Sequence, residues 1–212
     1  MRKTKTQTRT AYHHGDLRAA LLDAAEIELT KKGVEAFSLR GVAKRAGVSH
    51  AAPAHHFSDA RGLLTALAAI GYERFIETQK RRQHDASPDP KAQLAALGLG
   101  YVDFAMANPA LFRLMFSSEK TNKTNEALAT ASSAAFDKLV VEIQNITKSD
   151  PYTDPIAMTD VMAVWAIVHG LADLMIAGRT RRITFLENLN KEEREAILSD
   201  IILRASTVQA SE

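Results

Sequence analysis

The chain contains no cysteine among its 212 residues, which excludes a disulfide framework and a thiolate metal site. It also lacks any run close to the ~18 uncharged apolar residues that a membrane-spanning helix needs. The opening MRKTKTQTRT is basic and polar, and no apolar segment follows it as one would in a secretory signal. We therefore expect a soluble, cytoplasmic protein that does not contact a membrane.

Charge is distributed unevenly along the chain, although the formal net charge is only +2. Residues 1–62 hold eleven Lys or Arg against six Asp or Glu, whereas the remainder carries a small negative excess. A basic N-terminal third on a mildly acidic body is typical of a segment that binds a polyanion. A solvated basic tail would give the same charge pattern, so charge alone does not decide between them.

Apolar residues at helical spacing run through most of the chain, and strand patterns are missing. Gly33 and Gly47 provide helix stops, while Ser38, Ser49 and Ser58 can cap the helices that follow. We therefore expect an all-α fold of about nine helices. The expected stretches are 17–29, 38–46, 49–57, 58–82, 91–107, 109–117, 125–148, 154–178 and a last helix that starts at Asn190.

Two prolines in His84–Pro90 form the clearest break between helices. We expect three parts: a basic arm over residues 1–10, a helix-turn-helix domain over residues 11–75, and a ligand-binding and dimerisation domain over residues 76–212. A disordered arm is favoured over one ordered in a minor groove, because the arm has no aromatic or capping residue. In the last part, small residues on the final two long helices would let these helices pair with their copies in a homodimer.

The segment Ser38–Phe57, SLRGVAKRAGVSHAAPAHHF, predicts two short helices joined by a tight turn. Small side chains on the second helix would let it approach the bases in a major groove. A purely structural helical hairpin is the alternative, but the short helix and the basic residues around it favour DNA binding. The residues with no evident core duty are His50, Ala51, Ala52, Ala54 and His56.

From Tyr12 to Phe75 the chain resembles the DNA-binding domain of tetracycline-repressor (TetR) type regulators, through the runs YHHGDLRAALLDAA and SLRGVAKRAGVSHAAP. Its second half is similar to the subset with a Trp-x-x-x-His-Gly stretch, here Trp165–Gly170. The resemblance implies a homodimer, a near-palindromic operator in double-stranded DNA, and a small-molecule effector that relieves repression. The residues that it implies for DNA binding are Ser38, Arg40, Ser49, His50, Ala51, Ala52, Ala54, His55 and His56.

Two positions depart from the pattern of that family. Ala54 stands where the family usually has Tyr, and Ala60 stands where it usually has Lys. Because both of the usual side chains touch phosphate, the resemblance implies that two backbone contacts are missing here. His55, His56 and Arg61 are the candidates to replace them.

The long helix expected from Asp154 carries one polar side chain, His169, on an otherwise apolar face. We expect Asp173, one turn further, to hydrogen-bond one ring nitrogen, which leaves the other nitrogen for a mainly apolar effector. The aromatic and thioether residues nearby are mostly explained as core, although small-molecule pockets have the same composition. The residues expected to line such a pocket are Tyr101, Phe104, Phe112, Met115, Phe136, Met162, Trp165 and His169.

Neither a metal centre nor a catalytic centre is expected. Adjacent histidines such as His55 and His56 point about 100° apart on a helix, and His169 with Asp173 has no third ligand. No phosphate-binding glycine loop or hydrolase motif is present, so an enzyme is a weak alternative and no cofactor is expected. The stronger alternative is a dimeric helical ligand-binding or scaffold protein that binds no operator.

Overall fold

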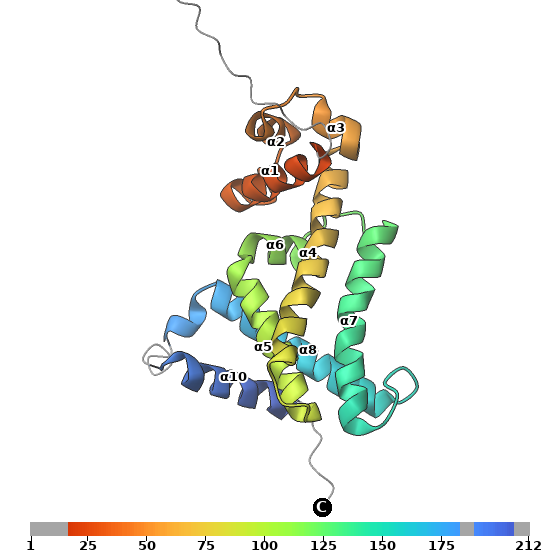
Figure 1. The fold of residues 1–212 in the computed structure, drawn as a ribbon, viewed down its shortest axis with the longest axis vertical. Coiled ribbons are helices and arrows are strands. Elements are labelled where there is room, and N and C mark those ends of the chain that lie inside the picture. The colour runs from red at the N-terminus through yellow and green to blue at the C-terminus, as the bar shows by residue number, and fades with distance from the viewer. Residues whose placement is uncertain (1–16, 183–188, 206–212) are drawn as a thin grey trace, which may run out of the picture.

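The computed structural model describes residues 17–182 and 189–205, and over these it is all-helical (Figure 1). It confirms the predicted fold class: the described residues form nine α-helices and one short 3-10 helix, η1, that the sequence does not predict. The basic arm lies outside the described residues. The elements are α1 (Leu17–Lys32), α2 (Leu39–Ala46), α3 (Ala52–Phe57), α4 (Ala60–His84), α5 (Pro90–Ala107), α6 (Pro109–Ser117), α7 (Glu126–Thr147), α8 (Pro155–Ile176), η1 (Arg179–Arg182) and α10 (Lys191–Ala205).

The caps of several helices follow the sequence closely. The Ser38 hydroxyl accepts from the Gly41 amide at the start of α2, and Gly47 ends that helix with a φ of +68°. Asn190 and Glu193 exchange hydrogen bonds of 2.9 Å at the start of α10, which is a capping box. These local signals need no tertiary context, which is why the sequence alone locates them.

Two predicted serine caps are wrong. Helix α3 begins at Ala52 after an Ala51 N-cap without a side-chain bond, so Ser49 lies in the preceding turn. Helix α4 is capped by Asp59, whose carboxylate accepts from the Gly62 amide at 2.7 Å. A carboxylate is the stronger acceptor at a helix N-terminus because the helix dipole favours negative charge there. Ser58 is displaced into the turn with a φ of +66°.

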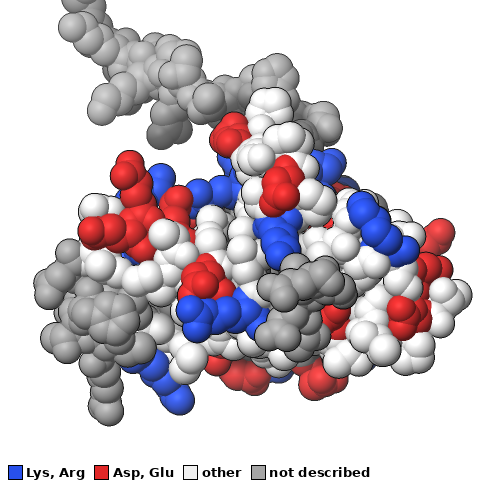
Figure 2. Space-filling view, turned by 90° about the horizontal axis from the view of Figure 1, so that it is seen from below, with Lys and Arg blue, Asp and Glu red and all other residues white. Residues whose placement is uncertain are grey.

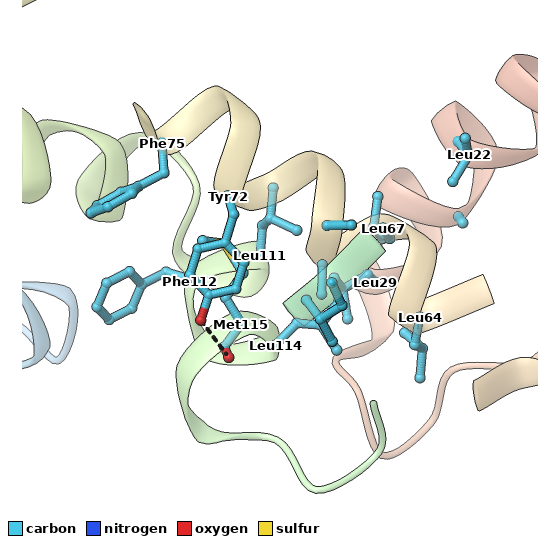
Figure 3. Close-up of a cluster of buried hydrophobic side chains, with 14 of the residues drawn as sticks. Leu22, Leu29, Leu64, Leu67, Tyr72, Phe75, Leu111, Phe112, Leu114 and Met115 are labelled. Carbon is cyan, nitrogen blue, oxygen red and sulfur yellow. Dashed lines mark hydrogen bonds between the residues drawn. The ribbon is translucent and has the colours of Figure 1, made fainter. Parts of the chain in front are cut away.

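Helix α4 connects the head, formed by α1–α3, with the helical body below it (Figure 1). One hydrophobic cluster continues along this helix from the head into the body. Figure 3 shows Leu29 of α1 and Leu67 of α4 in the same cluster as Leu114 of α6. The expected boundary at residue 75 therefore falls inside a continuous helix and a shared core.

The last helix is attached to the body through Arg82 of α4. Its guanidinium donates to Asp103 of α5 at 2.6 Å and to Glu195 of α10 at 2.9 Å. These hydrogen bonds raise the pKa of Arg82, and the bond from Arg82 lowers the pKa of Glu195. Below this ion pair, Ile202 of α10 is fully buried against Gly98 of α5, where a side chain would collide with it.

The lowered pKa of Glu195 makes this attachment sensitive to acid. The stabilisation is present above the usual glutamate pKa of 4.5, and it is lost as the pH falls through the lower folded value. We expect Glu195→Gln to reduce the free energy of unfolding at pH 7 by about 1 kcal/mol or less, since the pair is partly exposed. In thermal melts this difference from the wild type should vanish toward pH 2. The exposed Glu192→Gln is the control, and a difference that persists in acid would contradict the assignment.

Candidate DNA-binding head and effector pocket

The head presents the outer side of α2 and α3 to solvent. Pro53 and Phe57 of α3 are buried, and they fix which side of this six-residue helix faces outward. Of the residues expected to bind DNA, Ala52 is half-buried and the others are exposed: Ser38, Arg40, Ser49, His50, Ala51, Ala54, His55 and His56. The outward face of α3 thus consists of small residues with two histidines at its C-terminal end.

A partly buried ion pair that the sequence did not suggest holds α2 against α1. Glu28 of α1 is only 5 % exposed, and its carboxylate accepts from Arg45 of α2 at 2.8 Å. Gly41 makes this arrangement possible, because a Cβ at that position would lie 2.1 Å from the Glu28 carboxylate. Arg45 is therefore paired with Glu28, although it is exposed like Arg40 and Lys44.

A cavity of about 510 Å³ lies in the body between α4, α5, α7 and α8. Four of the residues expected to bind a ligand line it, namely Tyr101, Met115, Phe136 and Trp165. Phe104 and Phe112 belong instead to the core, where each is 1 % exposed. Met162 and His169 line a separate, smaller hollow together with Phe116.

Helix α4 contributes lining residues that the sequence analysis does not single out. Tyr72, Phe75 and Gln79 all face the cavity. The Tyr72 hydroxyl donates to the Met115 carbonyl at 3.3 Å (Figure 3), and burial raises the pKa of Tyr72 to about 12. The sequence could have placed Gln79 on the inward side of the helix, because Gln79 follows the inward-facing Phe75 by four residues.

The expected hydrogen bond between His169 and Asp173 is wrong. His169 Nδ1 instead lies 2.7 Å from the hydroxyl of Tyr101, which reaches it from α5. Burial lowers the pKa of His169, and the charge of the exposed Asp173 opposes this only in part. Burial also raises the pKa of Tyr101, and this effect outweighs a hydrogen bond from Trp165 that lowers it. The pair is therefore neutral at pH 7, and His169 orients a side chain that lines the cavity.

Titratable residues do not gather elsewhere in a way that suggests metal chemistry. Over the described residues, no group of three or more His, Asp or Glu side chains is placed to hold an ion. The end of the body away from the head, seen in Figure 2, carries acidic and basic side chains interspersed. The described residues of that end thus present both signs of charge, unlike the basic N-terminal third of the sequence.

A helix-turn-helix head joined through one core to a helical body with an apolar cavity is the architecture of DNA-binding regulators that carry a ligand domain. Residues 21–67 match a family model described as bacterial regulatory proteins, tetR family. Residues 94–190 match a model described as tetracyclin repressor-like, C-terminal domain. The chain belongs to the tetracycline-repressor family of transcriptional regulators.

Individual proteins resemble the chain over part or most of its length. The HTH-type transcriptional regulator BetI of Yersinia pestis is 33 % identical over 99 residues, or 45 % of this chain. The match spans about half (49 %) of that relative's length. A Rhodococcus sp. RHA1 protein of unknown function is 33 % identical with a TM-score of 0.74, over 93 % of this chain and 98 % of the other. The regulator PfmR of Thermus thermophilus shares the fold, at 19 % identity and a TM-score of 0.64, over 87 % and 97 % of the two chains.

The contact between Tyr101 and His169 predicts how stability depends on pH. Because burial lowers the pKa of His169, the contribution of its neutral form is complete above the usual value of 6.5 and falls as the pH drops through the folded value. We expect His169→Phe to destabilise the protein at pH 7.5 by about 1–3 kcal/mol, since it leaves a buried hydroxyl without its partner.

The same variant should lose part of the decline in melting temperature that the wild type shows between pH 7 and pH 5. His55→Phe, at an exposed position, is the matched control and should keep the wild-type profile. An unchanged profile for His169→Phe would mean that this histidine is not the group that titrates.

Proposed function

We propose that this protein is a cytoplasmic, homodimeric transcriptional repressor that binds a near-palindromic operator and is released by a small, mainly apolar effector. In this proposal α3 enters the major groove, the cavity of the body holds the effector, and the protein catalyses no reaction. The observation that carries it is one hydrophobic core that continues from Phe57, behind the exposed face of α3, to residues that line the cavity. The finer placement in a Trp-x-x-x-His-Gly subset rests on Trp165–Gly170 alone.

The proposed DNA face combines small residues with few positive charges. Ala51 and Ala54 allow the backbone of α3 to approach base edges, and His50 stands beside them at the turn. The family's usual Lys is absent at Ala60, and the neighbouring Arg61 donates to the Thr121 carbonyl at 3.1 and 3.3 Å. Phosphate binding thus falls mainly to Arg40 and its neighbours, and because few phosphates are neutralised, operator affinity should fall only gently with rising salt concentration.

The proposed dimer uses an apolar stripe along α8. This helix is long and apolar enough to cross a membrane by length and composition. Only 28 % of its apolar 18-residue stretch is buried in the single chain. Its exposed side includes Ile156, Ile167 and Leu174 at 76 %, 36 % and 43 % exposure. Ala163 and Gly170 lie between them at helical spacing, and the position of a Cβ on Gly170 is open. Covering this stripe with a second copy removes a surface that water solvates poorly.

A loop between α6 and α7 offers a route from the cavity to the head. Thr121 and Lys123 of this loop line the cavity. The Thr121 carbonyl accepts from Arg61, and the Asn122 amide donates to the Thr65 hydroxyl at 2.8 Å, so the loop is bound to the first turns of α4. An effector that moves this loop would alter the position of α4 and hence the separation of the two heads.

The first test concerns DNA binding itself. We expect Arg40→Ala and His50→Ala each to weaken operator binding by about 1–3 kcal/mol without loss of helicity. The operator is first selected from random DNA, and titrations at one fixed salt concentration then compare the variants. Glu119→Ala, at an exposed residue of the α6–α7 loop, serves as the control. Wild-type protein that selects no sequence would favour the alternative, a dimeric ligand-binding or scaffold protein without an operator.

The second test concerns the dimer. Ile167 is exposed in the single chain, so Ile167→Glu costs the monomer little, whereas in the proposed interface it places two like charges without partners near the two-fold axis. We expect sedimentation to show a helical monomer, or an unfolded chain if the dimer is obligate. Val141→Glu on α7, with 49 % exposure, is the matched control. A stable dimer of Ile167→Glu would place the interface elsewhere.

A further inference from the structure

One buried polar atom in the cavity has no partner. Gln79 of α4 is 3 % exposed and lines the cavity. Its Oε1 is the one buried side-chain nitrogen or oxygen atom of the described residues that lacks a hydrogen bond. Buried polar atoms are normally satisfied, because leaving one without a partner costs folding free energy. An orphan acceptor in the wall of a cavity points to a donor that arrives with a ligand.

The orientation of the Gln79 amide follows from its other contact. Its Nε2 donates to the Leu97 carbonyl at 3.4 Å. A flipped amide would bring two oxygen acceptors together, because a carbonyl cannot donate, so the nitrogen must face Leu97. Helices α4 and α5 are also too close here for rearrangement, since a Cβ on Gly100 would lie 2.7 Å from the Gln79 Cα. The acceptor oxygen is therefore left without a partner in the protein, on a residue that lines the cavity.

The other residues that line the cavity restrict which ligand can supply a hydrogen-bond donor to Gln79 Oε1. The Tyr72 hydroxyl is bound to Met115, the Tyr101 hydroxyl to His169, and the Ser132 hydroxyl donates to Ala129. The charged lining residues in the described chain, Lys123 and Asp137, are exposed and so belong to the rim. A charged ligand would enter an interior with no opposite charge to meet it, which is strongly unfavourable. The apolar walls combine aliphatic residues, among them Leu94, Leu97 and Leu139, with six aromatic ones: Tyr72, Phe75, Tyr101, Phe116, Phe136 and Trp165.

We infer that the effector is an uncharged aromatic compound with one hydroxyl or N–H group, which donates to Gln79 Oε1. This rests on the proposal that the cavity holds the effector, and it adds the chemical class. Edge-to-face contacts with the six aromatic side chains would hold the ring system. A volume of about 510 Å³ suits a ligand with two or three rings. Gln79 is then the residue that selects compounds with a donor over apolar isosteres.

Two naphthalenes of the same shape test this selection. 2-Naphthol carries a donor and is uncharged at pH 7, whereas 2-methylnaphthalene has none and is the more hydrophobic of the two. Burial of apolar area alone therefore favours the methyl compound. We expect calorimetric titration of the wild-type full chain to show the reverse, with 2-naphthol bound about two- to tenfold more tightly. 2-Naphthoate, the charged analogue, should bind more weakly than either.

The variant Gln79→Met keeps the length of the side chain and removes the acceptor. We expect it to abolish the preference, through a two- to tenfold loss for 2-naphthol and little change or a gain for 2-methylnaphthalene. Its melting temperature without probe should be unchanged or higher, because the orphan acceptor is gone. Gln93→Met replaces an amide outside the cavity lining and should keep the wild-type preference.

Equal affinity of the wild type for the two neutral probes, or no binding of 2-naphthol, would overturn the inference. A preference that survives in Gln79→Met would overturn it as well, since the donor would then bind elsewhere. Operator binding is measured on the same preparations without probe. An intact operator complex without probe selection refutes only the chemical class, whereas probe selection without operator binding refutes only the proposed repressor.

Discussion

The arrangement of the whole chain depends on one helix that belongs to both of its parts. Helix α4 packs its first turns into the head and its remaining turns into the body, within one apolar cluster that includes Leu64, Tyr72 and Phe75. A close-packed interior transmits displacement instead of absorbing it. The head therefore cannot change its angle without a change in how α4 meets α5, α6 and α7, and the cavity lies among these contacts.

Arg61, Arg82 and Gln79 of this helix differ in whether their side chains are fully hydrogen-bonded. Arg82 attaches α4 to α5 and α10, and Arg61 attaches it to the α6–α7 loop, so both ends are held by hydrogen bonds. Gln79 lies between these ends, and its amide is only half satisfied. A ligand that completes the Gln79 contact is thus bound to the element that carries the head. Coupling to the head further requires that the ligand bind one position of α4 better than another.

Local signals in the sequence were sufficient for the fold and for the surface of the head. The Ser38 cap, the Gly47 stop and the apolar spacing fix α2, and the exposed residues of α3 follow once Phe57 is known to be buried. The cavity was predicted only in part, because several of its walls depend on how helices distant in sequence are rotated about their axes. Phe112 and Trp165 are both aromatic residues at inward positions of helices, yet Phe112 lies in the core and Trp165 lines the cavity. The partner of His169 could not be inferred either, since Tyr101 approaches it from 68 residues away.

The hydrogen bonds between the α6–α7 loop and α4 can be compared in free energy with the coupling between an effector site and an operator site. A tenfold change in operator affinity requires about 1.4 kcal/mol of coupling between the two sites. The bonds from Arg61 to Thr121 and from Asn122 to Thr65 contribute about 0.5–1.5 kcal/mol each, and the loop that makes them also lines the cavity. The free energy of these two contacts is therefore comparable with the coupling that a tenfold change in operator affinity requires. Arg61 released from Thr121 would also change the charge presented beside α3, so the loop bears on both the position of the head and its electrostatic surface.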